Sequence, residues 1–386
     1  MSLEKKMLDS LGDYENEIFA LNDYMAEHPE IGSREFESSK RIVELLRAYG
    51  MEVEYPFAGL PTAFRARINP GAKRRAALMA EYDALPEIGH ACGHCASGSA
   101  SVMAALALHD LQHELDFGID LIGTPDEEMT GGKCYMADDG VFDGYDFAAM
   151  VHMGATTGFM SNIIALDGML IRYRGVPAHA AGAPEKGRNA LNAARLFFDA
   201  VDMMRQHVIP EARLHGYIRN GGSASNVVPE YSEIEFLSRA PMRKDLNDIT
   251  EWVRECAHAA AMATRTKVEI EVLGKPFHDM YVSPPGAALI TRIYGEMGLV
   301  MEERKGSGSS DVGNVDYVCP AFQTLMGIGQ DLGTHTHEFG CAMTDPRTHT
   351  AIVNAAAFLL KLVAKLYADP ALLESIQEAH RKYRSV

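Results

Sequence analysis

Short apolar runs alternate with amphipathic segments along much of the chain. Arg75–Tyr82 has the pattern of a buried strand, and Ala96–Leu111 that of a helix built from small residues. Further apolar runs of strand length lie at Ile119–Ile122, Phe147–Val151 and Phe322–Ile328. Because short apolar runs separated by helical patterns are typical of parallel sheets, the sequence predicts an α/β fold with a mostly parallel sheet flanked by helices.

The middle of the chain has a different order of elements. Between about residues 168 and 278 the pattern predicts strand, helix, strand, strand, helix and strand, with a turn at Gly221–Gly222. This β-α-β-β-α-β order is that of ferredoxin-like α+β domains. A length of 386 residues exceeds what one hydrophobic core usually supports, so two domains are expected.

Charge and cysteine content narrow the class of protein. The formal net charge is -17, and no long run of Lys or Arg could follow a phosphate backbone, which excludes nucleic acid as a partner. No N-terminal segment joins a basic region to an apolar stretch, and no apolar run approaches the ~20 residues that span a bilayer. Six dispersed cysteines predict reduced thiols. We therefore expect a soluble cytoplasmic protein without a membrane partner.

The segment Asp83–His94 concentrates metal-ligand residue types, because it holds a carboxylate, a thiol and two imidazoles. Cys92 and His94 are two residues apart, a spacing that places side chains on one face only in extended chain. The sequence therefore predicts that this motif lies in a loop.

Three further ligand-type groups each follow a predicted strand. They are Asp126–Glu128, His152, and His335 with His337. A lone His or Glu at a strand end is usually a solvated loop residue, but ligands in open α/β sheets bind beyond the carboxyl ends of the strands. The agreement of all the groups with this rule predicts that they meet at one site.

The predicted inserted block contributes to none of these groups. We therefore predict a discontinuous metal-binding catalytic domain of residues 1–167 and 279–386, with residues 168–278 inserted as a second domain.

A thiolate, imidazoles and a carboxylate suit zinc, and manganese also accepts oxygen and nitrogen ligands. These candidates are too many for one tetrahedral ion, so we predict two divalent ions ~3.5–4 Å apart. The predicted ligands are Cys92, His94, Glu128, His152 and His335. His337 is close enough in sequence to replace His335, and the sequence leaves this choice open.

Adjacent side chains point in different directions, so Glu128 can bind metal while Glu127 faces an activated water as general base. A solvated acidic loop is the alternative, but Pro125 and Gly131–Gly132 favour an organised turn. Asp83 is either a strand-end cap or an acceptor that orients a metal-bound imidazole, and we favour the second role.

Two other classes of function are compatible with some of these residues. Cys92 and Cys95 form a C-x-x-C pair that would suit a thiol-disulfide oxidoreductase, although it leaves the downstream Glu and His residues unexplained. A non-catalytic metal or metabolite-binding protein of the same fold is the other. The spacing of His179, Asn226 and Arg239 does not assign them a role.

Together, five motifs resemble the metallo-amidohydrolases of the aminoacylase family, and the resemblance covers nearly the whole chain. The motifs are Glu81–Pro86, His90–His94, Gly123–Glu128, His179–Ala181 and Ser310–Val315. The chain looks most similar to the subgroup of aminobenzoyl-glutamate hydrolases, dipeptidases and indole-acetyl-amino acid hydrolases. In that subgroup an Ala-Cys-Gly-His segment supplies a Cys and a His to the metals.

The resemblance implies the same ligands, the same general base and a supporting role for Asp83. It implies hydrolysis of the amide bond in a small N-acyl or N-aroyl amino acid or a dipeptide-like substrate. It also implies that the inserted domain forms a homodimer or higher homo-oligomer, and that His179 stabilises the tetrahedral oxyanion with Asn226 nearby. Charge complementarity suggests Arg239 as an anchor for a substrate carboxylate.

The chain departs from the family pattern at three places. Cys95 stands where Asn or Asp is usual, Met129–Thr130 where Gly is common, and His337 where Pro is usual. We expect Cys95 and Met129 to line the pocket and to change substrate preference.

Overall fold

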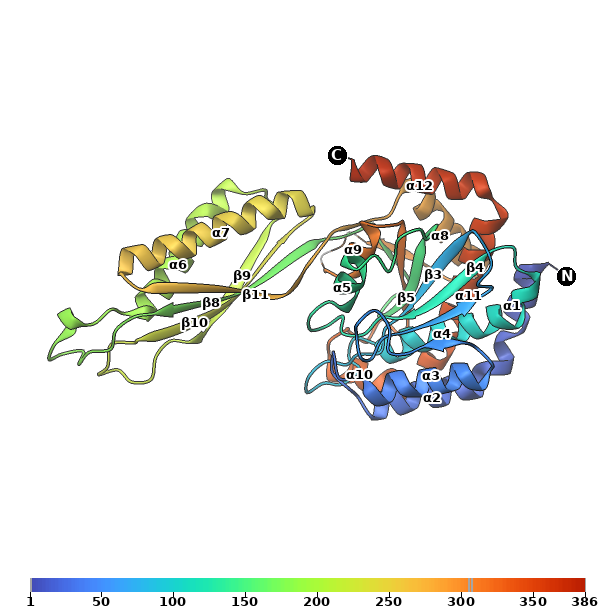
Figure 1. Ribbon diagram of the computed structural model, residues 1–386, viewed down its shortest axis with the longest axis horizontal. Coiled ribbons are helices and arrows are strands. Elements are labelled where there is room, and N and C mark those ends of the chain that lie inside the picture. Colours follow the sequence, from blue (N-terminus) through green and yellow to red (C-terminus); the bar gives the residue numbers. More distant parts are fainter. Residues whose placement is uncertain (1, 305, 307, 386) are drawn as a thin grey trace. The chain divides into compact units, whose positions relative to one another are not determined.

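The structure is a computed structural model, in which residues 2–304, 306 and 308–385 are described (Figure 1). The chain divides into two compact units. Unit 1 comprises Met1–Ile163 and Met280–Val386, and unit 2 comprises Ile164–Asp279.

Unit 1 is built on an eight-stranded sheet whose centre is parallel. Its strands, in spatial order, are β1 (Val53–Glu54), β2 (Phe64–Ile68), β4 (Gly118–Gly123), β3 (Arg75–Ala80), β5 (Ala148–Gly154), β14 (Ala321–Gly327), β6 (Gly158–Met160) and β13 (Glu302–Arg304). The neighbours β4, β3, β5 and β14 all run parallel, whereas β2 pairs antiparallel with β4, and β1 pairs antiparallel with β2 at the edge. Since the central strands are almost wholly buried, their near-continuous apolar sequence is explained. The predicted α/β fold class is confirmed.

Helices surround this sheet (Figure 1). They are α1 (Leu3–Asp9), α2 (Glu15–Glu27), α3 (Phe36–Ala48), α4 (His94–Asp110), α5 (Gly132–Asp138), α8 (Pro284–Glu296), α9 (Val312–Asp316), α10 (His337–Cys341), α11 (Pro346–Ala368) and α12 (Pro370–Arg384). A two-stranded sheet pairs β7 (Asn162–Ile163) with β12 (Met280–Tyr281). Helix α4 packs on β3 and β5, and α11 packs on α4, so both lie in the core.

The start of α4 approaches the end of β3 closely. A Cβ atom on Gly98 would lie 2.2 Å from the backbone oxygen of Glu81, so only glycine fits there. This contact brings the first turn of α4 beside the residues that follow β3. The predicted helix of small residues is thus confirmed, but it begins at His94 rather than Ala96.

One helix has membrane-spanning length and an apolar composition, which the short apolar runs of the sequence did not indicate. Pro346–Ala368 is long and apolar enough to cross a bilayer, but 61% of its most apolar window is buried within the protein. It packs against α4, β5 and β14. Its apolar character is that of a core helix.

Unit 2 is a four-stranded sheet with two helices. Its elements are β8 (Ala165–Arg174), α6 (Ala190–Met204), β9 (Arg213–Asn220), β10 (Tyr231–Ala240), α7 (Arg243–Thr264) and β11 (Lys267–Phe277). The sheet order is β11-β8-β10-β9, and every neighbouring pair is antiparallel. The predicted β-α-β-β-α-β order is confirmed.

Candidate metal centre

The centre begins immediately after β3, where Asp83 connects two other segments. Its Oδ1 lies 2.9 Å from Nδ1 of His94, and its Oδ2 accepts a hydrogen bond of 2.9 Å from the backbone N–H of Glu128. Asp83 is fully buried. Its carboxylate therefore fixes the His94 ring and leaves Nε2 as the nitrogen available to a metal.

Opposite charges set the ionisation of this pair. Burial alone would raise the pKa of Asp83, but the His94 imidazole outweighs it and holds that pKa below its usual value. Burial alone would lower the pKa of His94, but Cys92, Asp83 and Glu81 together raise it well above its ordinary range. Without a bound cation, the protein therefore favours a protonated imidazole among these anionic groups.

Cys92 and His94 flank a glycine that the local geometry requires. Gly93 has φ +87°, and a Cβ atom there would lie 2.8 Å from Cβ of Met153. Cys92 is in a loop, as predicted, whereas His94 is the first residue of α4. Potential ligand atoms of Cys92, His94 and Glu128 lie within 4.8 Å of one another. This thiol, imidazole and carboxylate form the first candidate ligand group.

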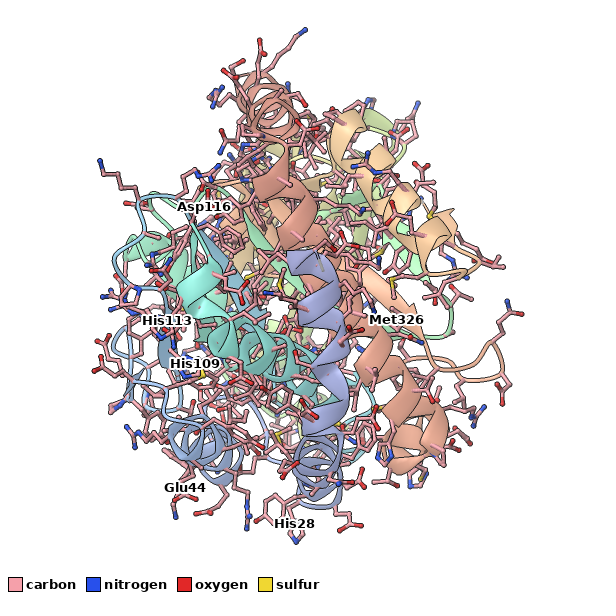
Figure 2. The ribbon with its side chains drawn as sticks, turned by 90° about the vertical axis from the view of Figure 1, so that its right-hand side faces the viewer. His28, Glu44, His109, His113, Asp116 and Met326 are labelled. Atoms are coloured by element: carbon pink, nitrogen blue, oxygen red, sulfur yellow. The ribbon has the colours of Figure 1, made fainter. Side chains whose placement is uncertain are left out.

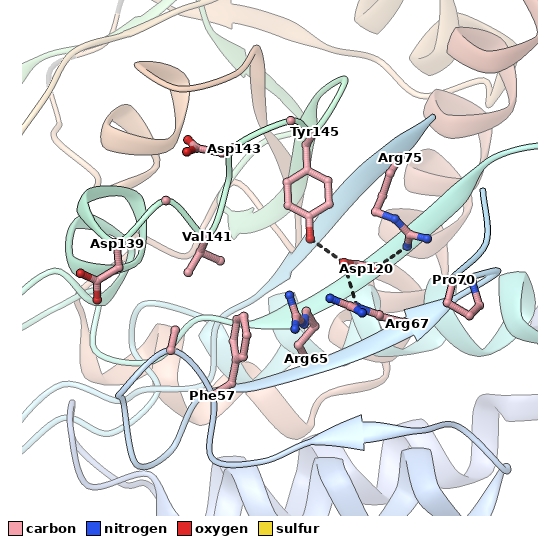
Figure 3. Close-up of a pocket in the computed structure, with 13 residues that line it drawn as sticks. Phe57, Arg65, Arg67, Pro70, Arg75, Asp120, Asp139, Val141, Asp143 and Tyr145 are labelled. Atoms are coloured by element: carbon pink, nitrogen blue, oxygen red, sulfur yellow. Dashed lines mark hydrogen bonds and ion pairs between the residues drawn. The ribbon is translucent and has the colours of Figure 1, made fainter. Parts of the chain in front are cut away.

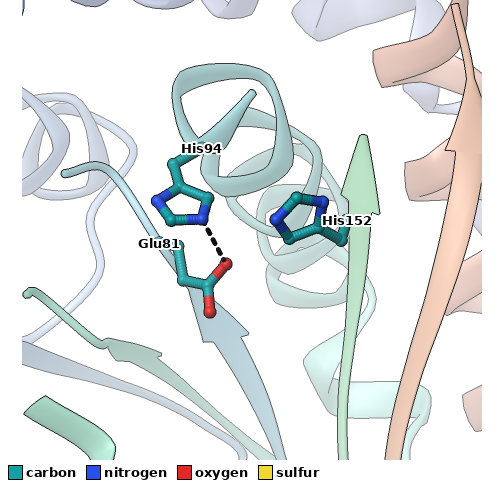
Figure 4. A group of neighbouring side chains, drawn as sticks. All are labelled: Glu81, His94 and His152. Carbon is teal, nitrogen blue, oxygen red and sulfur yellow. Dashed lines mark ion pairs between the residues drawn. The ribbon is translucent and has the colours of Figure 1, made fainter. Parts of the chain in front are cut away.

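A second candidate ligand group shares His94 (Figure 4). Potential ligand atoms of Glu81, His94 and His152 also lie within 4.8 Å of one another. His152 lies within β5 and not after a strand as predicted. Its Nδ1 is 2.6 Å from the backbone oxygen of Met153, an acceptor, so this nitrogen carries the proton and Nε2 is free to bind a metal. Burial and the nearby His94 lower the pKa of His152, which favours the neutral, metal-binding ring.

His335 and Glu128 also lie side by side. Nε2 of His335 is 3.4 Å from Oε1 of Glu128, and the backbone N–H of His335 donates to the oxygen of Ala91 at 2.7 Å. His337 instead has its Nδ1 3.3 Å from Sγ of the exposed Cys341. The structure thus brings His335 next to a candidate ligand and pairs His337 with a surface thiol.

Glu127 is partly exposed and surrounded by other carboxylates. Desolvation raises its pKa well above the usual value, and the negative charges of Glu128, Asp311 and Glu81 raise it further. A carboxyl group with a raised pKa holds a proton more readily than an ordinary carboxylate does, which is a property of a general base that must carry the proton to a leaving group.

The loop that carries Glu127 and Glu128 is supported by Glu35, which sequence reasoning missed. Oε1 of Glu35 accepts from the backbone N–H of Asp126 at 2.9 Å, and Oε2 accepts from the Thr62 hydroxyl at 3.0 Å. Burial, reinforced by Asp83, raises the pKa of Glu35 to about 7. No local pattern around Glu35 indicated this contact, because its partners are distant in sequence.

Glu81, Lys133 and Asp311 were also left without a role by the sequence. All three are fully buried and connected by ion pairs. A signal for Glu81 was present, since residues two apart in extended chain share a face and Asp83 follows at that spacing.

The C-x-x-C pair lacks the character of a redox motif. Cys92 and Cys95 are free thiols and fully buried. Burial raises the pKa of Cys92 to about 11 and that of Cys95 still higher. Reactive thiols instead have lowered pKa values and some exposure, so the oxidoreductase interpretation is disfavoured.

Cys95 lies inside α4, and Met129 is about half exposed.

In unit 2, His179 and Asn226 lie in paired loops. Nδ1 of His179 accepts hydrogen bonds from the backbone N–H groups of Gly182 at 3.0 Å and Ala181 at 3.3 Å. The backbone oxygen of Asn226 accepts from Ala180 at 3.0 Å. Arg239 lies in β10, in register with Leu166 of β8, and burial lowers its pKa. Because Nδ1 of His179 is an acceptor, the neutral ring carries its proton on Nε2.

A hollow elsewhere in unit 1 has a different character (Figure 3). It has a volume of about 560 Å³ and is lined by Arg65, Arg67, Arg75 and Asp120, among others. Asp120 accepts from the Tyr145 hydroxyl at 2.6 Å, pairs with Arg75, and lies 3.8 Å from Nε of Arg67. Its carboxylate already neutralises much of this positive charge.

Several other histidines of unit 1 serve local structure (Figure 2). His28 ends α2 and stacks on Tyr24 with ring centroids 4.2 Å apart. His109 lies in the last turn of α4, 3.1 Å from the amide nitrogen of Gln112, and the exposed His113 follows. These histidines therefore make local contacts near the surface and are not part of the candidate metal centre.

The parallel sheet and the grouped thiol, imidazole and carboxylate side chains define a class, the metal-dependent hydrolases of amide and peptide bonds. Comparison with known families then identifies the particular one. Residues 77–365 match the family described as Peptidase family M20/M25/M40, and the chain belongs to this family. The predicted enzyme class and family resemblance are confirmed.

Individual proteins show the same likeness. The chain is 32% identical to the Xaa-Arg dipeptidase of Mus musculus over 97% of this chain and 91% of that protein. It is 35% identical to a p-aminobenzoyl-glutamate hydrolase chain of Escherichia coli (strain K12) over 64% of this chain and 56% of that protein. The crystal structure of the Bacillus subtilis YXEP protein, described as a dinuclear metal-binding peptidase from the M20 family, matches with a TM-score of 0.64 at 19% identity, covering 90% of this chain and 99% of that chain.

Proposed function

We propose that the protein hydrolyses the amide bond of an N-acyl or N-aroyl amino acid or of a dipeptide, using two divalent ions. The observation that carries this proposal is the pair of ligand groups that share His94, each with its ligand atoms within 4.8 Å. The names of the relatives, a dipeptidase and an aminobenzoyl-glutamate hydrolase, support this substrate class.

The donor set fits zinc or manganese. Nε2 of His94 is buried without a hydrogen-bond partner among the described residues, as expected for a nitrogen reserved for a cation. Cys92, His94, Glu128, His152 and His335 would hold the ions. When bound, such ions polarise a carbonyl group and lower the pKa of water.

The protein's own residues supply the proton transfers and orientation. Glu127 accepts the proton of the attacking water and returns it to the leaving amine, a task suited to its raised pKa. Asp83 holds the His94 ring in one orientation.

Unit 2 contributes substrate contacts in this proposal. His179 presents a fixed Nε2–H donor that suits a developing oxyanion, because Gly182 and Ala181 occupy its Nδ1. The backbone oxygen of Asn226 holds the loop of His179 by accepting a hydrogen bond from Ala180. Arg239 pairs with the substrate carboxylate. We further propose that unit 2 forms a homodimer, and that the enzyme acts in the cytoplasm, where its free thiols stay reduced.

Release of amino acid by purified protein tests this function. The enzyme is loaded in turn with zinc and manganese and given Xaa-Arg dipeptides, aminobenzoyl-glutamate and N-acyl amino acids, each with a chelator control. Glu127→Gln should retain metal and lower kcat by about 10²–10⁴-fold. Near-normal turnover by this variant would refute the assignment of the base. Tight ligand binding without turnover by the metal-loaded wild type would instead indicate a binding protein.

A further inference from the structure

A buried ammonium group lies behind the candidate metal centre. Nζ of Lys133 is 2.6 Å from Oε1 of Glu81 and 2.7 Å from Oδ1 of Asp311, and all three side chains are fully buried. The backbone N–H of Lys133 also donates to Oδ2 of Asp311 at 2.9 Å. Both oxygens of Asp311 are therefore occupied by Lys133, whereas only one oxygen of Glu81 is.

The second oxygen of Glu81 points to the candidate metal ligands (Figure 4). Its Oε2 lies 3.3 Å from Nε2 of His94, and within the described part of the chain neither atom has a hydrogen-bond partner. Leaving two such atoms buried and unsatisfied is costly. In a tetrahedral zinc site with bonds of about 2.0–2.1 Å, two ligand atoms lie about 3.3–3.4 Å apart. The observed separation matches two ligands of one ion.

The allocation of ligands gives a second reason. One group contains Cys92 and Glu128 with His94, and His335 lies beside Glu128. An imidazole nitrogen binds one ion at a time, and the 3.3 Å between Nε2 of His94 and Oε2 of Glu81 assigns His94 to the ion of the second group. Cys92, Glu128 and His335 then remain for the first ion, and without Glu81 the second ion would have only His94 and His152 as ligands.

The charges of the cluster also permit this role. Lys133 carries one positive charge between the carboxylates of Glu81 and Asp311. One ammonium offsets one carboxylate and leaves one net negative charge beside His94 and His152. A divalent cation is the group that such a buried charge would favour.

We propose that Glu81 is a sixth metal ligand, binding through Oε2 the ion on the His152 side, and that Lys133 is a positioning residue that holds Oε1. This inference rests on the proposed two-metal function and adds a ligand to it. The ligand class is a carboxylate for a zinc or manganese ion.

The test compares Glu81→Gln with Asp311→Asn. Both substitutions neutralise a fully buried carboxylate that contacts Lys133, but only Glu81 has an oxygen free to bind metal. Metal content is measured after gel filtration of zinc-loaded protein, and metal affinity is measured by chelator competition. In cobalt-loaded protein, the cobalt–thiolate absorption band shows whether the ion bound by Cys92 is retained. Circular dichroism and unfolding in chelator check that each variant is folded.

We expect two ions per chain in the wild type and in Asp311→Asn. Glu81→Gln should hold one ion, bind the second ion more than about 100-fold more weakly than wild type, and keep the cobalt–thiolate band. If Glu81 only supported another ligand, its loss would lower the affinity for the second ion by about 10–100-fold. If Glu81→Gln does not fold, Glu81→Asp, which retracts the carboxylate, should show the same selective loss.

Three results would overturn the inference. They are wild-type affinity for both ions in the Glu81 variant, loss of both ions from the folded variant, and an equal loss of the second ion in Asp311→Asn. In each case chelator-sensitive turnover by wild type would leave the proposed function intact. A wild-type protein that binds no ions and releases no amino acid would instead refute the proposed function itself.

Discussion

Replacement of Glu35 by Gln should change how stability depends on pH. The pKa of Glu35 in the folded protein is raised to about 7 from an ordinary value of 4.5, chiefly by burial. The folded state therefore binds a proton more tightly than the unfolded chain, and stability falls as pH rises through the interval between these values. At 1.36 kcal/mol per pKa unit, the full effect is about 3 kcal/mol, most of which falls between about pH 5 and about pH 8.

Glutamine removes this titration and keeps most of the contacts. Its amide oxygen can still accept from Asp126 and Ser33, and its amide group can donate to the Thr62 hydroxyl. The free energy of unfolding is measured by urea titration in chelator at both pH values and constant ionic strength. Wild type should lose about 2–3 kcal/mol relative to the variant as pH rises, because the shifts of groups distant from Glu35 cancel in the difference.

Glu37→Gln is the matched control. Glu37 lies two residues further along and is exposed, so the same chemical change should leave the pH profile unchanged. Parallel pH profiles for wild type and Glu35→Gln would show that Glu35 titrates in the folded protein as it does in the unfolded chain. The reasoning from burial would then be wrong.

Three further substitutions test the supports of the centre. Gly98→Ala places a Cβ atom 2.2 Å from the Glu81 oxygen and should destabilise the fold by about 1–3 kcal/mol in thermal or urea unfolding, whereas Gly71→Ala, with open space around it, should not. Asp83→Asn weakens the hold on His94 and should lower metal affinity by about 10–100-fold in chelator competition; unchanged affinity would contradict its orienting role. Lys133→Met leaves two buried carboxylates uncompensated and should cost about 3–5 kcal/mol in urea unfolding of metal-free protein, a result that an unchanged midpoint would contradict.

The meeting of distant ligand groups was predictable because of a general property of parallel sheets. β4, β3, β5 and β14 are neighbours in the sheet and run parallel, so their carboxyl ends share one edge. Ligand-type residues lie at or near the ends of all these strands, and this could be predicted without the order of the strands in the sheet. The chemistry of the centre could therefore be inferred from residue types and strand ends alone.

The exact element that carries each residue was less predictable. His152 lies within β5 because the strand continues to Gly154 beyond the apolar run. The Cys92–His94 spacing predicted that His94 lies in the loop. Instead, the loop ends at Gly93, which has a positive φ, and His94 is the first residue of α4. In β5 and in α4 the backbone hydrogen bonding continues beyond the apolar residues that predicted the element. For this reason the bounds of elements are often predicted incorrectly.

The buried support of the centre has a different physical origin and could not be read from local pattern. Asp83 was predicted to orient an imidazole because it stands beside the His motif in sequence. Lys133 would ordinarily be assigned to the surface, since lysine is almost never fully buried without partners. Its burial depends on two carboxylates that come from distant segments, Glu81 after β3 and Asp311 before α9. Only the fold shows that one lysine satisfies both oxygens of Asp311 but a single oxygen of Glu81, and this difference distinguishes a structural carboxylate from a candidate ligand.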